Sequence, residues 1–231
     1  MTIQTVAQSS LRLAVVSSPK PAEGLEGSLA HAQLKRVEAK EFLFAEGDPI
    51  SHVYRIETGA IALYKVLADG RRQIMSFAYP GDIVGLGVDE SYTINAQAVK
   101  PTRVRCLPIG SLRQFAATDP AFGFKLYEAM AKELAATRDL MLTTGQRNAM
   151  ERVAGFLLAF SRRNQRQGKD PAVFELPMTR MDIGDFLGLT IETVSRTFTK
   201  LKLMRLIELA HCTEVRLANI EELKRLAEGG R

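Results

Sequence analysis

Two oppositely charged side chains, Glu192 and Arg196, lie four residues apart in a stretch with a helical pattern. Residues at this spacing share one helix face, so the two could form a surface ion pair contributing about 0.2–0.5 kcal/mol. Both side chains also have the chemistry to contact nucleobases, because arginine can donate two hydrogen bonds to guanine and glutamate can accept one from cytosine. The residues around the pair decide between these two interpretations.

The neighbours of this pair favour DNA. Ile191 and Ser195 lie on the same outward face when Val194 and Phe198 are directed inward, and isoleucine can contact a thymine methyl group. The predicted base-contacting residues are Ile191, Glu192, Ser195 and Arg196. Hydroxyl and cationic side chains nearby are suited to phosphates. The predicted phosphate-contacting residues are Thr179, Arg180, Thr190, Thr193, Lys200 and Lys202.

A helix-turn-helix would position these side chains. Thr179 and Asp182 have the spacing of a capping box, which begins a short helix, and Gly188 allows the chain to turn after it. Thr190 then caps a second helix over residues 190–204. In such a motif the second helix can lie in the major groove of DNA. The inward positions of that helix are Val194, Phe198 and Leu201.

A long helix precedes this region. Asp119 can cap a helix whose first position is occupied by Pro120. The helix is predicted over residues 119–145, ending at Gly145. Its narrow apolar seam is typical of a helix that pairs with a second copy, so we predict a homodimer. The alternative is that the helix lies along its own domain. The predicted dimer-interface residues are Phe122, Leu126, Met130, Leu134, Thr137 and Met141.

The segment before the long helix alternates with period two and breaks at glycines, which predicts about eight short antiparallel strands. Asp69 and Gly70 mark a tight hairpin turn. The predicted fold class is α+β: an N-terminal antiparallel β-roll (jelly roll), a long dimerisation helix and a C-terminal winged helix-turn-helix. The domains are a flexible tail (1–28), the β-roll (29–118), the dimerisation helix (119–145) and the DNA-binding domain (146–231), whose wing is a β-hairpin over residues 206–220.

Composition is that of an ordinary globular protein, with 46% hydrophobic and 25% charged residues. The net charge of +5 favours a partner that carries negative charge. No apolar run is long enough to cross a bilayer, and no export signal is evident, so a cytoplasmic protein with no membrane partner is expected. Its two cysteines are far apart and form no metal-binding motif.

The stretch GLTIETVSRTFTKL, with Glu192, Ser195 and Arg196, resembles the recognition helix of the FNR branch of the CRP/FNR family of bacterial transcription regulators. The resemblance extends from about residue 30 to the end, and within the branch DIGDFLGLTIETVSR is most similar to FixK-type regulators. It implies a homodimeric activator of low-oxygen-response genes, with RNA polymerase as a further partner. It also implies a palindromic double-stranded DNA target with TTG/CAA half-sites.

The β-roll departs from the cyclic-nucleotide-binding members of that family. Where they carry a ribose-binding glutamate and a phosphate-binding arginine, this chain has Gly85-Leu86-Gly87 and Ile94-Asn95-Ala96. A phosphate facing Ile94 would be buried without its cation, which costs several kcal/mol, so we predict no cyclic-nucleotide binding. Residues 1–30 contain no cysteine for an iron-sulfur cluster. We predict no cofactor and no metal.

Two other functions compete with that of a ligand-independent regulator. An effector-dependent regulator, whose β-roll binds an unidentified small molecule, stays open. An enzyme is disfavoured, because a cupin-like metal site needs clustered histidines and the strand region from Gln33 to Leu107 offers only His52. Of the two cysteines, Cys106 is predicted to pack beside Val104 on a strand, and Cys212 could be an oxidation-sensitive thiol.

Overall fold

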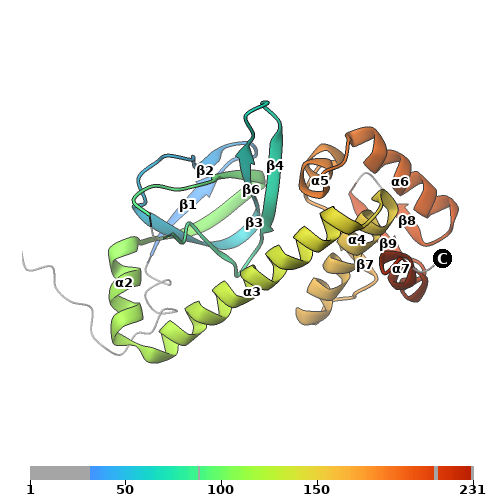
Figure 1. Ribbon diagram of the computed structural model, residues 1–231. Helices are drawn as coiled ribbons and strands as arrows, with labels where there is room; N and C mark the ends of the chain where they lie inside the picture. Colours follow the sequence, from blue (N-terminus) through green and yellow to red (C-terminus); the bar gives the residue numbers. More distant parts are fainter. Residues whose placement is uncertain (1–31, 88, 211–212, 230–231) are drawn as a thin grey trace, which may run out of the picture.

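The computed structural model of the chain describes residues 32–87, 89–210 and 213–229. Figure 1 shows a β-roll at one end, the helical C-terminal part at the other, and a long helix, α3, that runs between them. The predicted α+β class is confirmed. The predicted tail at 1–28 lies outside the described residues. Of the helices that are described, none combines the length and the apolar character that crossing a bilayer requires.

The β-roll is one antiparallel sheet that has six strands within the described residues, fewer than the eight predicted. Two long strands replace several short ones, because β-bulges bend β3 and β6 instead of ending them. The strand order is β1-β6-β3-β4, with β2 paired to β6 and β5 paired to β3. The strands are β1 Gln33–Val37, β2 Phe42–Phe44, β3 His52–Val66, β4 Arg72–Ala78, β5 Ile83–Val84 and β6 Asn95–Pro108.

The hairpin between β3 and β4 confirms the turn predicted at Asp69 and Gly70. Gly70 has a φ of 84°, and Val66 pairs with Arg72 across the turn. Alternation along the strands directs one set of side chains into the core of the roll, as period-two patterns do. The largest fully buried side chains of this core are Val37, Ile56 and Ile61.

Two helices follow the sheet, α2 Ile109–Thr118 and α3 Pro120–Gln146. The predicted cap of α3 is confirmed: the Asp119 side chain accepts hydrogen bonds from the backbone N–H groups of Ala121 and Phe122. The predicted end at Gly145 is wrong, because α3 continues to Gln146 and stops where Arg147 turns extended. Asn148 then caps the next helix with a capping box.

The C-terminal part packs four helices around a small sheet of order β7-β9-β8. Its core contains the predicted inward residues of the helix-turn-helix, together with Val153, Leu157 and Leu223. The predicted wing is confirmed as the β8/β9 hairpin, whose tip at 211–212 lies outside the described residues. The elements are α4 Ala149–Arg166, β7 Val173–Glu175, α5 Arg180–Leu187, α6 Ile191–Leu203, β8 Ile207–Ala210, β9 Glu214–Leu217 and α7 Ile220–Ala227.

Candidate nucleic-acid interface

Helices α5 and α6 are begun and ended by local signals. The Thr179 hydroxyl accepts a hydrogen bond from the Asp182 N–H at 3.1 Å, and the Asp182 carboxylate accepts one from the Thr179 N–H at 2.9 Å. Gly188 ends α5 in the left-handed conformation, with a φ of 65°, where glycine carries no steric penalty. Thr190 caps α6 by accepting from the Thr193 N–H at 3.2 Å. The helix-turn-helix predicted from these residues is confirmed.

One residue that fixes the angle between the two helices was missed by the sequence reasoning. Gly184 lies inside α5, and a β-carbon added there would lie 2.6 Å from the backbone oxygen of Leu189 in the turn. That distance is shorter than real contacts allow, so only glycine permits the turn to fold back this closely. A glycine four residues before the helix-ending glycine was the available signal.

The inner face of α6 is buried as predicted. Val194 and Leu201 are completely buried, and Phe198 is 2% exposed. Thr197 is also buried, which the sequence reasoning did not identify, and its hydroxyl donates to the Thr193 carbonyl oxygen at 2.8 Å. This self-contained hydrogen bond lets a polar residue lie inside the core.

The outer face of α6 carries the four predicted base-contacting residues. Ile191, 40% exposed, lies with Glu192, Ser195 and Arg196 on the solvent side of the helix. Within the part of the chain that the structure describes, the side chains of Glu192 and Arg196 form no ion pair, either with each other or with another residue. The interpretation of Glu192 and Arg196 as a surface ion pair is therefore not supported, and both charges remain available to an external partner.

The predicted phosphate-contacting residues separate into two groups. Lys200 and Lys202 are exposed near the end of α6. Thr193 joins Arg196 and Lys200 along an open groove beside the first residues of α4, and the two cations favour an anion there. Arg180 differs, because its guanidinium lies over the Phe198 ring at 3.5 Å and so contributes to packing in its own chain.

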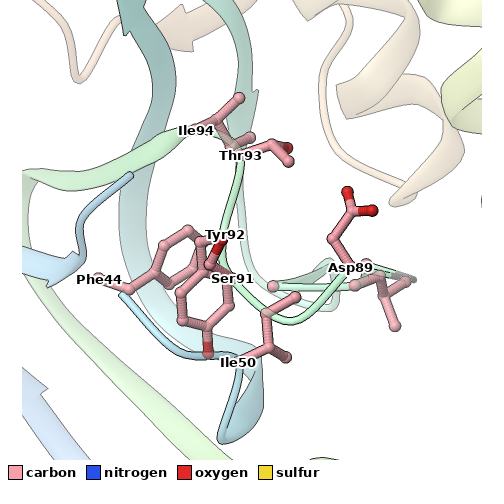
Figure 2. Close-up of a pocket in the computed structure, with 10 residues that line it drawn as sticks. Phe44, Ile50, Asp89, Ser91, Tyr92, Thr93 and Ile94 are labelled. Carbon is pink, nitrogen blue, oxygen red and sulfur yellow. The ribbon is translucent and has the colours of Figure 1, made fainter. Parts of the chain in front are cut away.

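The β-roll holds a small cavity at the positions where the sequence lacks nucleotide-binding residues. Its volume is about 60 Å³, against several hundred for typical ligand pockets. Figure 2 shows the rings of Phe44 and Tyr92 stacked beside it, with centroids 3.9 Å apart. The chain's own aromatic and aliphatic side chains, including Ile50 and Ile94, occupy the space around it.

Cys106 is half-buried and packs against the core of the β-roll, next to Val104 as predicted. Burial raises its pKa, and the nearby charge of Lys35 only partly opposes this. At neutral pH the group is therefore a thiol and not the reactive thiolate. Cys212, the other candidate for oxidation, lies outside the described residues.

Comparison with known proteins gives matches over both halves. Residues 151–226 match the Crp-like helix-turn-helix domain, and residues 34–119 match the cyclic nucleotide-binding domain. The chain is 42% identical over 176 residues to the transcriptional activatory protein AadR of Rhodopseudomonas palustris, covering 76% of this chain and 74% of that protein. It is 39% identical over 171 residues to the nitrogen fixation regulation protein FixK of Bradyrhizobium diazoefficiens, covering 74% of this chain and 72% of the relative.

A solved structure is similar to this chain over both halves. The structure of FixK2 from Bradyrhizobium japonicum superposes with a TM-score of 0.79 at 39% sequence identity, covering 84% of this chain and 96% of that chain. The similarity therefore includes the β-roll, the long helix and the helix-turn-helix.

Proposed function

Because this chain belongs to the CRP/FNR family of transcription regulators, we propose that it acts as a homodimer on a palindromic operator read by α6. Membership itself makes the chain a DNA-binding transcription activator and not an enzyme. The observation that carries the proposal is the outer face of α6, where Glu192 and Arg196 are exposed and have no ion-pair partner among the residues that the structure describes.

The proposed dimer seam differs in part from the predicted one. Phe122 is only 3% exposed and packs with Val53, Leu107 and Leu112 in its own chain, so it is removed from the seam. Large apolar side chains further along α3 are exposed instead, with Tyr127 at 66%, Met130 at 55% and Leu134 at 52%. The revised seam is Tyr127, Met130, Leu134, Thr137 and Met141.

This revised seam has the alternating spacing of three and four residues that defines a coiled-coil heptad. The predicted seam included Leu126 and began with three successive spacings of four residues. A row of residues with that spacing drifts around the helix. Isolated apolar residues on a surface need no explanation, but a row of them over residues 127–141 of this 27-residue helix favours a second copy of the chain as its cover.

Two-fold symmetry would place the two α6 helices in successive major grooves, about 34–36 Å apart. The FixK-type sequence of α6 suggests TTG/CAA half-sites. Relatives named as a nitrogen fixation regulation protein and as an anaerobic regulatory protein support a role in the response to low oxygen. RNA polymerase would be the partner through which the bound dimer activates transcription.

The β-roll is proposed to act without a cyclic nucleotide. A cavity of about 60 Å³ cannot admit one unless the stacked rings of Phe44 and Tyr92 separate. Ile94 also offers no charge to a phosphate. The same narrow space gives no specific support to the alternative of an unidentified effector in this pocket.

Selection of bound duplexes from random DNA, using purified protein with no added ligand, tests the proposal. We expect enrichment of palindromes that carry TTG/CAA half-sites at one spacing. Transcription with purified RNA polymerase from a selected site would then show activation. Recovery of no sequence preference without ligand would contradict ligand-independent recognition, and enrichment of single half-sites would contradict the dimer.

A further inference from the structure

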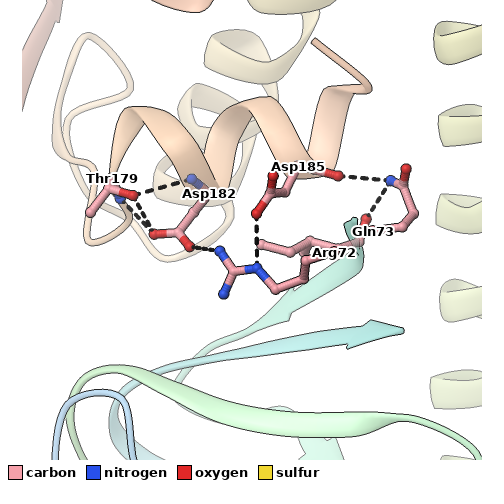
Figure 3. A network of polar contacts seen from close by, with 6 residues as sticks. Arg72, Gln73, Thr179, Asp182 and Asp185 are labelled. Carbon is pink, nitrogen blue, oxygen red and sulfur yellow. Dashed lines mark hydrogen bonds and ion pairs between the residues drawn. The ribbon is translucent and has the colours of Figure 1, made fainter. Parts of the chain in front are cut away.

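The hairpin of the β-roll is joined to the first helix of the helix-turn-helix by an ionic contact. Arg72, at the start of β4, lies between Asp182 and Asp185 of α5 (Figure 3). Its Nε atom donates to Asp185 Oδ2 at 2.8 Å, and one terminal nitrogen donates to Asp182. The next residue, Gln73, donates from its side-chain amide to the Asp185 carbonyl oxygen at 2.8 Å. We call these four residues the clamp.

The clamp is largely shielded from water. The side chains of Arg72, Asp182 and Asp185 are 26%, 14% and 25% exposed. Burial acts to lower the pKa of Arg72, but the hydrogen bonds to Asp185 and Asp182 outweigh it and raise that pKa above its ordinary value. Removal of one member of such a group leaves an uncompensated charge, so the contact is sensitive to substitution.

Aromatic contacts flank the clamp and extend the junction. The Arg72 guanidinium lies over the Tyr64 ring at 5.3 Å, and Phe77 of β4 contacts Phe186 of α5 with ring centroids 5.4 Å apart. Further along, the edge of the β-roll meets α4, where Arg163 lies over the Tyr79 ring at 4.1 Å. The β-roll and the helix-turn-helix therefore meet through matched polar and apolar groups.

Asp182 connects this junction to the local structure of α5. One of its carboxylate oxygens accepts from the Thr179 N–H and begins α5, while the other accepts from Arg72 (Figure 3). Helix α5 is in turn held at a fixed angle to α6 by the close approach of Gly184 to Leu189. The position of the β3/β4 hairpin is thereby transmitted to α6 through groups in direct contact.

The covalent link between the two parts is short and extended. Arg147 and Asn148 separate α3 from α4, and both have extended backbone angles. Arg152 braces this link by donating to the carbonyl oxygens of Arg147 at 2.8 Å and of Leu187 at 3.0 Å. A link of this kind can act as a hinge. Arg152 holds the end of α5 at Leu187, whereas the clamp holds the same helix at Asp182 and Asp185. The clamp would therefore oppose rotation of α5 about the link.

We propose that Arg72 is a positioning residue that determines operator spacing: it holds the helix-turn-helix in one orientation against its own β-roll, so that the dimer accepts one separation between half-sites. This inference rests on the proposed function. One added base pair shifts a half-site by about 3.4 Å and rotates it by roughly one tenth of a turn. A clamped α6 cannot follow that change, whereas a released one can.

The test compares binding to palindromes whose half-site separation is the selected one or differs by one base pair. In Arg72→Gln, the preference for the selected separation should fall about tenfold relative to the unchanged chain, because the domain can then reorient. Asp185→Asn should give a similar fall, and the double variant no further fall, since both remove one interaction.

Arg71→Gln is the matched control. Arg71 lies next to Arg72 in the same hairpin, but its side chain is 77% exposed and pairs with Asp69 within the turn. The Arg71→Gln substitution removes one positive charge, as Arg72→Gln does, but leaves the contacts of the clamp unchanged. Its spacing preference should equal that of the unchanged chain.

Hydrogen exchange without DNA gives a second measurement that does not depend on the proposed function. Arg72→Gln should accelerate exchange in residues 180–187, whereas Arg71→Gln should not. If the unchanged chain binds DNA and Arg72→Gln retains the full spacing preference, the inference is wrong. Binding of no duplex by the unchanged chain would overturn the proposed function, and the spacing role with it, while faster exchange would still locate the clamp. If Arg72→Gln fails to fold, Asp185→Asn takes its place.

Discussion

Gly184 in α5 and Leu189 in the following turn approach so closely that a β-carbon on Gly184 would lie 2.6 Å from the Leu189 carbonyl oxygen. The partner atom is backbone and cannot rotate away. Gly184→Ala should therefore open the angle between α5 and α6 and lower the free energy of unfolding by about 1–3 kcal/mol. Urea denaturation measures the loss, and DNA affinity should fall with it.

Gly110→Ala is the control for that substitution. Gly110 also lies in a helix, but a β-carbon there would meet nothing within 4 Å. We expect this change to stabilise the protein by up to about 1 kcal/mol, because alanine is the better helix former. Equal effects at the two glycines would contradict the role given to Gly184.

Arg196→Ala and Lys202→Ala should weaken DNA binding in different ways. Loss of the Arg196 side chain should cost about 1–3 kcal/mol per half-site and relax the preference at one base pair. Loss of the Lys202 side chain should weaken binding to every sequence alike and reduce the salt slope by about one. Titration of matched and mutated duplexes at several salt concentrations separates the two. An unchanged base preference in Arg196→Ala would remove Arg196 from the recognition face.

Leu134→Glu should convert the dimer to a monomer, because it places a charge on the exposed apolar seam of α3. Ala135→Glu adds the same charge one residue further, where the helix turns away from the seam. Ala135 is exposed, so this change should leave the mass in solution unaltered. Sedimentation analysis measures both. Retention of the dimer by Leu134→Glu would move the interface elsewhere.

Arg205→Gly should increase stability. Arg205 follows Met204, the C-cap of α6, with a φ of 56°, and the Leu206 N–H donates to the Leu201 carbonyl oxygen at 3.0 Å. This ending requires a left-handed residue, which costs less for glycine than for arginine even after the entropy of the unfolded chain is included. The expected gain is about 0.5–1 kcal/mol in urea denaturation. Lys200→Gly, within the helix, should instead lose about 1 kcal/mol.

Tyr79 makes the junction between the β-roll and α4 sensitive to alkali. Burial raises its pKa above the ordinary value of 10.0; the nearby Arg163 acts to lower the pKa and Asp82 to raise it. The folded state therefore favours the neutral phenol, so the stabilisation is complete below pH 10.0 and is lost as the pH rises above it. The loss should approach about 1.4 kcal/mol per pH unit. Tyr79→Phe should flatten the decline of the urea midpoint with rising pH on the alkaline side. If the slope of that decline is unchanged in Tyr79→Phe, groups other than Tyr79 cause the decline.

The sequence alone determined the elements whose signals are local. The capping residues Asp119, Thr179 and Thr190 form hydrogen bonds to backbone groups within three residues, so their spacing predicts where helices begin. Gly188 ends α5 through its own backbone conformation. The outward face of α6 also followed from period alone, because the burial of Val194, Phe198 and Leu201 fixes which positions remain outside.

The tertiary structure decided the contacts between residues far apart in sequence. Phe122 has the spacing of the dimer seam, yet it packs on Leu107 and Leu112, because α2 and α3 fold back beneath the β-roll. Arg72 and Asp185 are separated by 113 residues, and neither carries a pattern that names the other. A helical period specifies which side of a helix is apolar but not what covers it, and a charge specifies only that some partner is favourable. Which surface meets which depends on how the whole chain packs.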